Sequence, residues 1–178
     1  SYLPQPRQTL LFSATFPEGV QSLAQRLSDD AVHVDVTTHE AAPPIRQQWC
    51  GIDARERDQA LVSVLAQFGG ERNMAFCNTK IECAEVSARL CREGMKAVTL
   101  HGDLEQQQRT QTLVRFANGS ANVLVASDVA ARGLDIDSVD AVFNHTLPAQ
   151  PEVYVHRIGR TGRGGETGSA ISLVADRD

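Results

Sequence analysis

Short apolar runs alternate with amphipathic helical patterns along most of the chain. Residues 47–52, 73–77, 97–100, 122–126, 139–144 and 169–174 are apolar runs of strand length. Residues 56–68, 81–92, 105–116 and 152–158 have the apolar spacing of helices. Strands separated by helices of this length imply right-handed crossovers and a largely parallel sheet. The pattern therefore predicts an α/β domain from about residue 45 onward, with helices on both faces of a parallel sheet.

The first 37 residues follow the same alternation but hold too few elements for a domain. They contain two predicted strands, at 9–12 and 31–36, and one predicted helix at 17–27. So few elements cannot bury a core of their own, which indicates the tail of a preceding domain. Residues 37–44 are small, polar and closed by two prolines, as expected of an extended linker. We therefore divide the chain into a domain tail at 1–37, a linker at 38–46 and the α/β domain at 47–178.

Composition and charge narrow the class of protein. Of the 178 residues, 42% are hydrophobic and 22% are charged, which is typical of a globular protein with a core. The net charge of −5 argues against nonspecific coating of DNA or RNA, because coating proteins carry a basic surplus. No apolar run approaches the roughly 18 residues that span a bilayer, and no leader pattern opens the chain. The four cysteines include no C-x-x-C pair, which favours reduced thiols over disulfides or zinc. We expect a soluble, cytoplasmic protein without a metal site.

Polar residues and a glycine follow three of the predicted strands. They are Asn78-Thr79-Lys80, His101-Gly102-Asp103 and Ser127-Asp128. In open parallel sheets of the RecA-like or Rossmann-like kind, ligands bind beyond the carboxyl ends of the strands. Ordinary turn and cap residues have the same composition, so any single one of these segments carries little weight. Their repetition at three strand ends predicts one shared binding edge.

The helix predicted at 105–116 begins beside this edge. Asp103 is a candidate cap for it, with the Gln106 side chain reaching back. Gln106 and Arg109 lie three residues apart and share a face with Leu113. Arg109 therefore either reaches a ligand at the edge or extends its apolar stem over the core, and the sequence leaves both open.

The segment 156–163, HRIGRTGR, is the one basic cluster in this acidic chain. Arginine binds phosphate oxygens with a fixed fork of donors, and the glycines before Arg160 and Arg163 allow close approach. We expect the positive charge from Arg157 to Arg163 to face a polyphosphate. The chain has no G-x-x-x-x-G-K-[ST] phosphate loop and no strand that ends in an acidic pair for Mg²⁺. This combination predicts half of a composite nucleotide site.

These segments resemble the motifs of the DEAD-box family of ATP-dependent RNA helicases, and the resemblance runs essentially end to end. The matching segments, in family order and spacing, are SAT at 13–15, AFCNTK at 75–80, HGDLEQQQR at 101–109, VLVASDVAARGLDI at 123–136 and YVHRIGRTGRG at 154–164. Ser127 stands where the family usually has threonine. The sequence of these segments looks most similar to the DbpA-type subfamily of bacterial members. The resemblance implies a second RecA-like domain preceded by a fragment of the first.

The resemblance also implies roles for individual residues. Arg160 and Arg163 would be arginine fingers on the γ-phosphate of ATP, and Gly133 and Asp135 would lie at the ribose. The residues that would grip the RNA backbone are Thr79, Gly102, Gln106, Arg109 and Ser127. The residues that would couple the two domains are Ser13, Thr15 and His156.

The cofactor and the partners follow from the same resemblance. The cofactor would be ATP with Mg²⁺, held mainly by the missing first domain, so this fragment alone should be inactive. The partners would be RNA, expected to be ribosomal RNA during large-subunit assembly, and the first RecA-like domain in cis, in a monomeric protein without membrane contact. Two alternatives stay open: a nucleic-acid clamp that has lost catalysis, and a DNA-directed relative. The intact arginines argue against the clamp, and backbone contacts that sense the 2′-hydroxyl favour RNA.

Overall fold

The computed structural model describes residues 7–12, 18–27, 32–34, 45–131, 136, 139–163 and 166–176. Contacts divide the chain into two units, Ser1–Glu40 and Ala41–Asp178. The linker predicted at 38–46 lies across this division, with its residues 38–44 outside the described ranges.

The described part of the first unit contains one helix, α1 (Glu18–Leu27), which confirms the helix predicted at 17–27 over residues 18–27. The strand predicted at 9–12 is wrong, and residues 32–34 form no strand either. A strand needs a hydrogen-bonded neighbour, and a lone helix supplies none. Phe12 and Val32 are each 88% exposed, so these apolar side chains lack the core that their pattern predicts.

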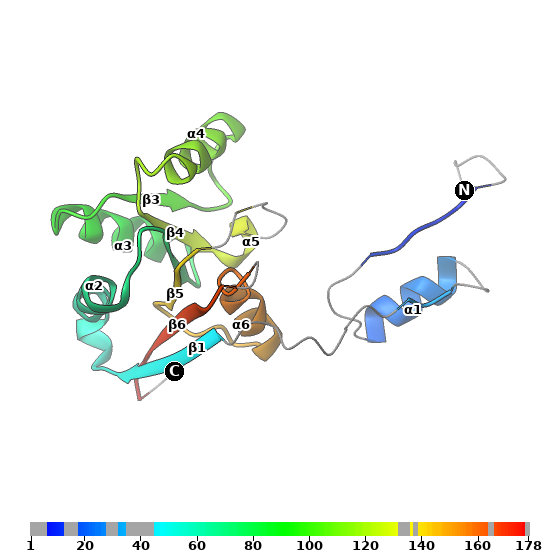
Figure 1. The fold of residues 1–178 in the computed structure, drawn as a ribbon, viewed down its shortest axis with the longest axis horizontal. Coiled ribbons are helices and arrows are strands. Elements are labelled where there is room, and N and C mark those ends of the chain that lie inside the picture. Colours follow the sequence, from blue (N-terminus) through cyan, green and yellow to red (C-terminus); the bar gives the residue numbers. More distant parts are fainter. Residues whose placement is uncertain are drawn as a thin grey trace. The chain divides into compact units, whose positions relative to one another are not determined.

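A six-stranded sheet forms the centre of the second unit (Figure 1). Its strands are β1 (Ile45–Gly51), β2 (Asn73–Cys77), β3 (Ala97–Leu100), β4 (Val123–Ser127), β5 (Ala141–Asn144) and β6 (Gly168–Val174). They lie in the order β1-β6-β5-β2-β4-β3, and every neighbouring pair is parallel. The strands β2, β4 and β5 are buried at every residue, as expected for a sheet covered on both faces. The predicted α/β fold with a parallel, RecA-like sheet is confirmed.

Helices cover both faces of this sheet and create two apolar cores (Figure 1). A single 3₁₀ turn (Ala54–Glu56) leads into α2 (Arg57–Phe68), which shares the first core with α3 (Lys80–Arg92). The second core contains α4 (Gln106–Ala117) and the short helix α5 (Asp128–Ala131). Representative members are Leu61, Leu90 and Phe143 in the first core and Met74, Phe116 and Ala130 in the second. Over the described ranges, no helix combines the length and the apolar character needed to cross a bilayer.

The last helix, α6 (Pro151–Ile158), lies on the second face. Its Arg157 guanidinium carbon is 5.2 Å from the centre of the Phe76 ring, which belongs to the second core. α6 begins after the carboxyl end of β5 and ends before the amino end of β6. The helix therefore runs from the carboxyl ends of the strands toward their amino ends.

The start of α4 differs from the prediction. Glu105, not Asp103, is the N-cap residue, and its backbone N–H donates to Gln108 Oε1 at 3.1 Å. Asp103 forms an ion pair with Lys80 instead. The helix begins later because Leu104 packs against the second core, and its N–H donates to the His101 carbonyl at 3.3 Å. The short helix α5 was not predicted at all, since four residues are too few to show a helical period.

Candidate functional site

Three of the predicted RNA-binding residues lie at the carboxyl edge of adjacent strands. Thr79 follows β2, Ser127 ends β4 and Gly102 follows β3, and β4 lies between the other two strands. Thr79 and Gly102 are exposed, whereas Ser127 is 8% exposed. A Cβ at Gly102 would meet no atom within 4 Å, so packing inside this chain does not require glycine there. The edge offers exposed polar groups to a ligand, and the charges of Lys80 and Asp103 there are paired with each other.

Thr79 also caps α3 through a reciprocal pair of bonds with Glu82. The Thr79 hydroxyl accepts from the Glu82 backbone N–H at 3.2 Å, and Glu82 Oε2 accepts from the Thr79 N–H at 2.9 Å. The Thr79 hydroxyl also donates to Glu82 Oε2 at 3.1 Å. The other carboxylate oxygen of Glu82 accepts from the Thr146 hydroxyl at 3.2 Å. This capping box fixes the orientation of Thr79 and ties it to the segment after β5.

Gln106 and Arg109 differ in their surroundings. Gln106 is exposed in the first turn of α4, while Arg109 is half-buried and its Nη2 donates to the Ala130 carbonyl at 2.6 Å. The Arg109 guanidinium is therefore bound to the end of α5 and does not simply extend over apolar surface. Because α5 follows Ser127 directly, this bond brings Arg109 beside the strand-end residues.

Arg157 lies inside the protein, and the expectation that it faces a polyphosphate is wrong. Its side chain is 1% exposed. The guanidinium donates to Asp128 Oδ1 at 2.7 Å, Asp128 Oδ2 at 2.8 Å, Asn78 Oδ1 at 2.8 Å, Asn144 Oδ1 at 3.2 Å and the Thr146 carbonyl at 2.6 Å. These acceptors come from the carboxyl ends of three strands, β2, β4 and β5. Helix α6 thus places the Arg157 guanidinium among the carboxyl ends of β2, β4 and β5.

Arg160 and Arg163 lie on the turn that joins α6 to β6. The Arg160 carbonyl accepts from the Val139 N–H at 3.1 Å, and the exposed Arg163 donates through Nε to the Gly159 carbonyl at 2.8 Å. A Cβ at Gly168 would lie 2.4 Å from the Gly162 nitrogen, so β6 approaches this turn as closely as glycine allows. Burial lowers the pKa of Arg160, and the positive charge of Arg163 lowers it further. The turn is closely packed and holds two like charges near each other.

The Arg160 side chain does not stand apart from the strand-end residues. Together with His156, it lines a hollow of about 20 Å³ against Asp128 and Ala131. His156 is exposed on the last turn of α6. The candidate site therefore has a polar strand-end part and a basic part after α6, and the Arg157–Asp128 pair lies between them.

Known proteins with the same sequence pattern agree with this geometry. The model of the helicase conserved C-terminal domain matches residues 56–165. The ATP-dependent RNA helicase DbpA of Escherichia coli is 48% identical over 177 residues, which cover 99% of this chain and 39% of that protein. The DEAD-box ATP-dependent RNA helicase RhpA of Helicobacter pylori is 40% identical, over 97% of this chain and 35% of that protein. The chain belongs to the DEAD-box helicase C-terminal domains. It spans less than half the length of these relatives.

Solved structures place the helicase domain in the same fold. Dbp5 of S. cerevisiae, bound to RNA and ADP BeF3, has a TM-score of 0.85 and 32% identity, covering 98% of this chain and 47% of that one. The E. coli DEAD-box protein SrmB, bound to the regulator of ribonuclease activity A, has a TM-score of 0.72 and 38% identity, covering 76% of this chain and 80% of that one. The predicted family and fold are both confirmed.

Four predicted site residues of the chain lie outside the described ranges: Ser13, Thr15, Gly133 and Asp135. Sequence reasoning missed Asn144 and Thr146, which accept from Arg157. Asn144 could have been suspected, because a polar residue that closes an apolar run must find a partner when it is buried. Within the described ranges, no group of three or more His, Cys, Asp or Glu side chains could hold a metal ion.

Buried titratable groups also lie on the α2/α3 side of the helicase domain. His145 is 4% exposed, and its Nε2 is 2.8 Å from Asp58 Oδ1. Burial lowers the pKa of His145, although the Asp58 carboxylate opposes this change. The hydrogen bond with the Cys83 thiol and then burial raise the pKa of Cys77. All four cysteines are free thiols, and Cys77 and Cys83 are buried.

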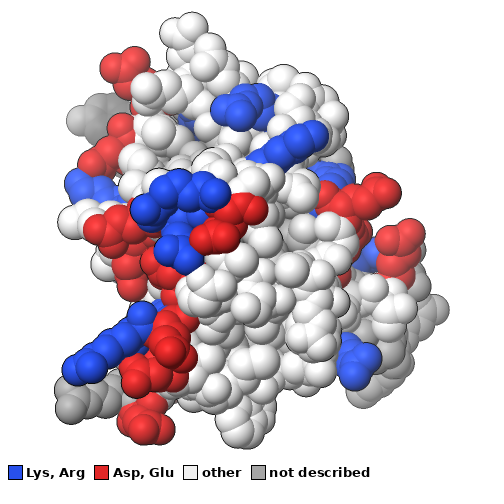
Figure 2. Space-filling model, turned by 90° about the vertical axis from the view of Figure 1, so that its left-hand side faces the viewer, with Lys and Arg blue, Asp and Glu red and all other residues white. Residues whose placement is uncertain are grey.

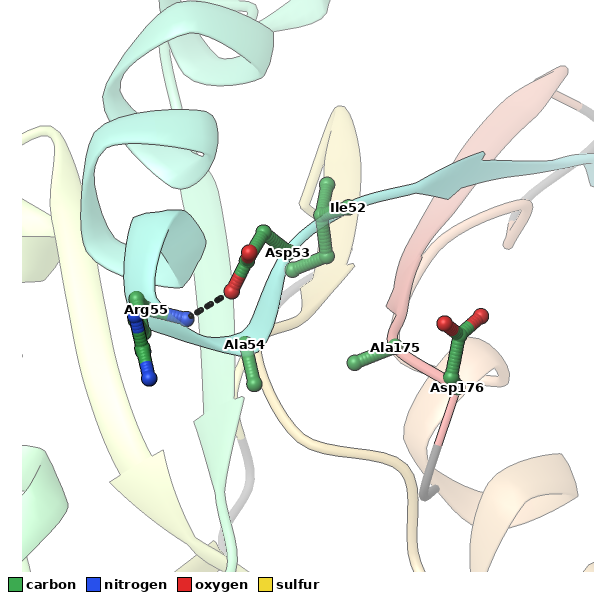
Figure 3. Close-up of a pocket in the computed structure, with 6 residues that line it drawn as sticks. All are labelled: Ile52, Asp53, Ala54, Arg55, Ala175 and Asp176. Atoms are coloured by element: carbon green, nitrogen blue, oxygen red, sulfur yellow. Dashed lines mark hydrogen bonds between the residues drawn. The ribbon is translucent and has the colours of Figure 1, made fainter.

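A larger hollow of the helicase domain lies apart from these residues. It measures about 620 Å³ and lies beyond the carboxyl ends of β1 and β6 (Figure 3). Its lining residues are Ile52, Asp53, Ala54, Arg55, Ala175 and Asp176. Asp53 is engaged as a cap, because its Oδ1 accepts from the Arg55 N–H at 2.9 Å. No predicted site residue lines this hollow.

Charge on the surface of the helicase domain is mixed. On the face that lies at the left of Figure 1, basic and acidic side chains alternate without a continuous basic stripe (Figure 2). Ion pairs of this domain include that of Arg89 on α3 with the C-cap residue Glu93, at 2.8 Å. This face gives no electrostatic track for a nucleic-acid backbone.

Proposed function

We propose that this domain is the second motor domain of an ATP-dependent RNA helicase, which closes with a first RecA-like domain over ATP and one RNA strand. The observation that carries the proposal is the closely packed turn after α6, which presents Arg160 and Arg163 in a chain without a phosphate loop. Such a domain supplies charge to a nucleotide that another domain holds. Both arginines are present, so no missing catalytic residue supports the alternative of a nucleic-acid clamp without catalysis.

Arg160 and Arg163 act as arginine fingers on the γ-phosphate. Burial and the positive charge of Arg163 lower the pKa of Arg160, so an anionic partner would stabilise its charged form. Guanidinium groups stabilise the charge that develops on the transferred phosphoryl oxygens, an effect of about 10³–10⁵ in turnover. Gly133 and Asp135 lie at the ribose, and Ser13, Thr15 and His156 couple the two domains. ATP fits these residues because the arginine fork matches phosphate oxygens.

The Mg²⁺ that accompanies ATP is held mainly by the first domain. The described residues here offer no cluster of carboxylates or imidazoles for it. When bound, ATP with Mg²⁺ supplies the phosphoryl group that is hydrolysed. The chain alone is therefore inactive, and RNA unwinding belongs to the full-length protein.

RNA is gripped through its sugar–phosphate backbone by Thr79, Gly102, Gln106, Arg109 and Ser127. Three observations support this. Thr79, Gly102 and Gln106 are exposed, Gly102 leaves room for close approach, and Arg109 reaches the end of α5. The similar Dbp5 structure is of a protein bound to RNA and ADP BeF3. Because the Lys80 and Asp103 charges at the edge are paired with each other, this domain binds RNA weakly on its own and tightens only when the cleft closes.

The proposals for the remaining partners are based on similar proteins and on the first unit of the chain. The exposed Phe12 and Val32 fit a segment cut from the core of a preceding domain, the first RecA-like domain in cis. One relative, 41% identical over 99% of this chain and 35% of its own length, is an ATP-dependent rRNA helicase of Neurospora crassa. We infer a ribosomal RNA target in ribosome assembly for a cytoplasmic, monomeric protein that does not contact membranes.

The test is Arg160→Ala in the full-length protein that contains this chain. RNA-stimulated ATP hydrolysis should be lost while RNA binding without nucleotide stays within about twofold, because Arg160 is not among the residues that grip RNA. The control is Arg92→Ala at the exposed end of α3, which should hydrolyse ATP like the wild type. Wild-type turnover in Arg160→Ala, or ATP hydrolysis by the isolated chain, would contradict the proposal.

A further inference from the structure

Arg157 is the point where the two parts of the candidate site meet. Its guanidinium contacts the residues that follow β2, β4 and β5 through Asn78, Asp128 and Thr146. Asn78 precedes Thr79 in the chain, and Asp128 follows Ser127. Arg157 itself comes three residues before Arg160. Arg157 therefore bonds to all three strand ends.

This contact has little freedom to move. The Arg157 side chain is 1% exposed, and Asp128 binds it with both carboxylate oxygens, at 2.7 Å and 2.8 Å. The Phe76 ring covers the guanidinium at 5.2 Å. A buried cation is stable only while its partners stay in place, so displacement of either strand end costs free energy. The bidentate geometry also restricts the relative orientation of α5 and α6.

A second branch of hydrogen bonds runs from Arg157 to Thr79. Arg157 donates to the Thr146 carbonyl at 2.6 Å, and the Thr146 hydroxyl donates to Glu82 at 3.2 Å. Glu82 in turn accepts from the Thr79 N–H at 2.9 Å. Thr79 is therefore joined to Arg157 both along the chain through Asn78 and across the sheet edge through Glu82. A shift of Thr79 would therefore disturb hydrogen bonds that lead to Arg157.

We propose that Arg157 and Asp128 form a positioning pair that couples the RNA-facing strand ends to the arginine-bearing turn after α6. Neither side chain touches RNA or ATP. The pair makes the strand ends, α5 and α6 one rigid unit, so RNA seated on Thr79 and Ser127 fixes the position of Arg160 and Arg163. The inference rests on the proposed function, since it assumes that RNA and ATP bind at these two parts.

The experiment measures how much a bound ATP analogue increases the affinity of the full-length protein for RNA, an increase called tightening below. The affinity for a single-stranded oligouridine is measured with and without a non-hydrolysable ATP analogue, for the wild type and for Asp128→Asn. Coupled sites strengthen each other by about 5–150-fold. Asp128→Asn keeps the shape of the side chain but removes its charge and one acceptor, so this tightening should fall to about threefold or less. RNA affinity without nucleotide should change by less than about threefold.

The control is Glu93→Gln, which neutralises the carboxylate partner of another arginine, Arg89, on α3. It should keep the full tightening. A purely structural role of Asp128 predicts a lower melting temperature with unchanged tightening at temperatures where the protein is folded, and that result would overturn the proposal. If Asp128→Asn does not fold, Asn78→Ser removes one uncharged acceptor from Arg157 and must show a reduced tightening.

The outcomes separate this inference from the proposed function. If Arg160→Ala abolishes hydrolysis while Asp128→Asn keeps the tightening, the function stands and the positioning pair is wrong. If Arg160→Ala hydrolyses ATP normally, the proposed function fails whatever Asp128→Asn shows. Arg157→Lys adds a further check, since lysine keeps the charge but cannot bind both Asp128 oxygens. It should reduce the tightening as Asp128→Asn does, and full tightening in Arg157→Lys would contradict the requirement for bidentate geometry.

Discussion

The last turn of α6 and the turn that follows it place the same kind of side chain in opposite environments. Arg157 is 1% exposed and donates to several acceptors from three strands. Arg163, six residues later, is exposed and donates to the Gly159 carbonyl of its own turn. One arginine stabilises the protein, and the other is available to a ligand.

The difference teaches that a basic segment need not form a basic surface. No acidic residue lies between Glu152 and Glu166, so the segment looks unneutralised in the sequence. The carboxylate that neutralises Arg157 comes from Asp128, which is 29 residues away. The positive charge that this segment can offer to a ligand is therefore smaller than the sequence indicates, because Arg157 is paired inside the protein and only Arg160 and Arg163 are left.

The largest expected difference between Arg163 and Arg157 is their effect on ATP hydrolysis. Arg163→Ala in the full-length protein should lower RNA-stimulated turnover by about 10³–10⁵, because an arginine finger acts on the transition state. Its free energy of unfolding should change by less than about 0.5 kcal/mol, since the side chain is exposed. Steady-state ATP hydrolysis and urea unfolding measure the two effects. Equal losses of turnover and stability would remove the distinction between Arg163 and Arg157.

The reverse result is expected at the buried arginine. Arg157→Ala leaves Asp128 and the other acceptors without a partner, and breaking a buried pair in this way costs about 3–5 kcal/mol of stability. Urea unfolding of the chain measures the loss. Asp103→Asn, which breaks an ion pair whose side chains are 56% and 59% exposed, is the matched control and should change little. A loss below about 1 kcal/mol in Arg157→Ala would show that the network is dispensable for folding.

The fold could be predicted from sequence because each strand is an apolar run bounded by polar residues. The strands predicted at 73–77 and 97–100 are β2 and β3 residue for residue, and the other strands of the sheet differ by one or two residues at an end. The strand-end rule also placed Thr79, Gly102 and Ser127 at one edge, and the sheet order then made them neighbours. These features depend on local pattern and on the general handedness of parallel sheets.

The environment of individual side chains could not be predicted in the same way. The burial of Arg157 depends on Asp128, Asn144 and Thr146, which meet only after β4 and β5 have paired on either side of β2. The cap of α4 moved to Glu105 because Leu104 is anchored in the second core, a constraint that the helical pattern does not contain. Both are consequences of tertiary contacts, which sequence spacing does not encode.

Arg109 tests whether a partly buried arginine can serve both structure and RNA binding. Arg109→Ala should weaken RNA binding about tenfold without sequence preference and reduce the salt dependence of binding, because a phosphate contact is lost. It should also cost about 1 kcal/mol of stability through the lost bond to Ala130. Arg115→Ala, on the exposed last turn of the same helix, is the control. Unchanged RNA affinity in Arg109→Ala would assign this residue to structure alone.

The smallest effect concerns the histidine on the other side of the sheet. Burial lowers the pKa of His145 in the folded state, so the unfolded chain takes up the proton first as the pH falls. The free energy of unfolding should therefore decrease as the pH falls below about 6.5, the ordinary pKa of histidine. His145→Gln cannot take up this proton and should lose less stability between neutral pH and about pH 5. Asp58 favours the protonated form of His145 and so opposes the effect of burial on its pKa. Asp58→Asn should therefore make the free energy of unfolding fall more steeply as the pH decreases. Parallel pH profiles for His145→Gln and the wild type would show that the acid sensitivity arises from other groups.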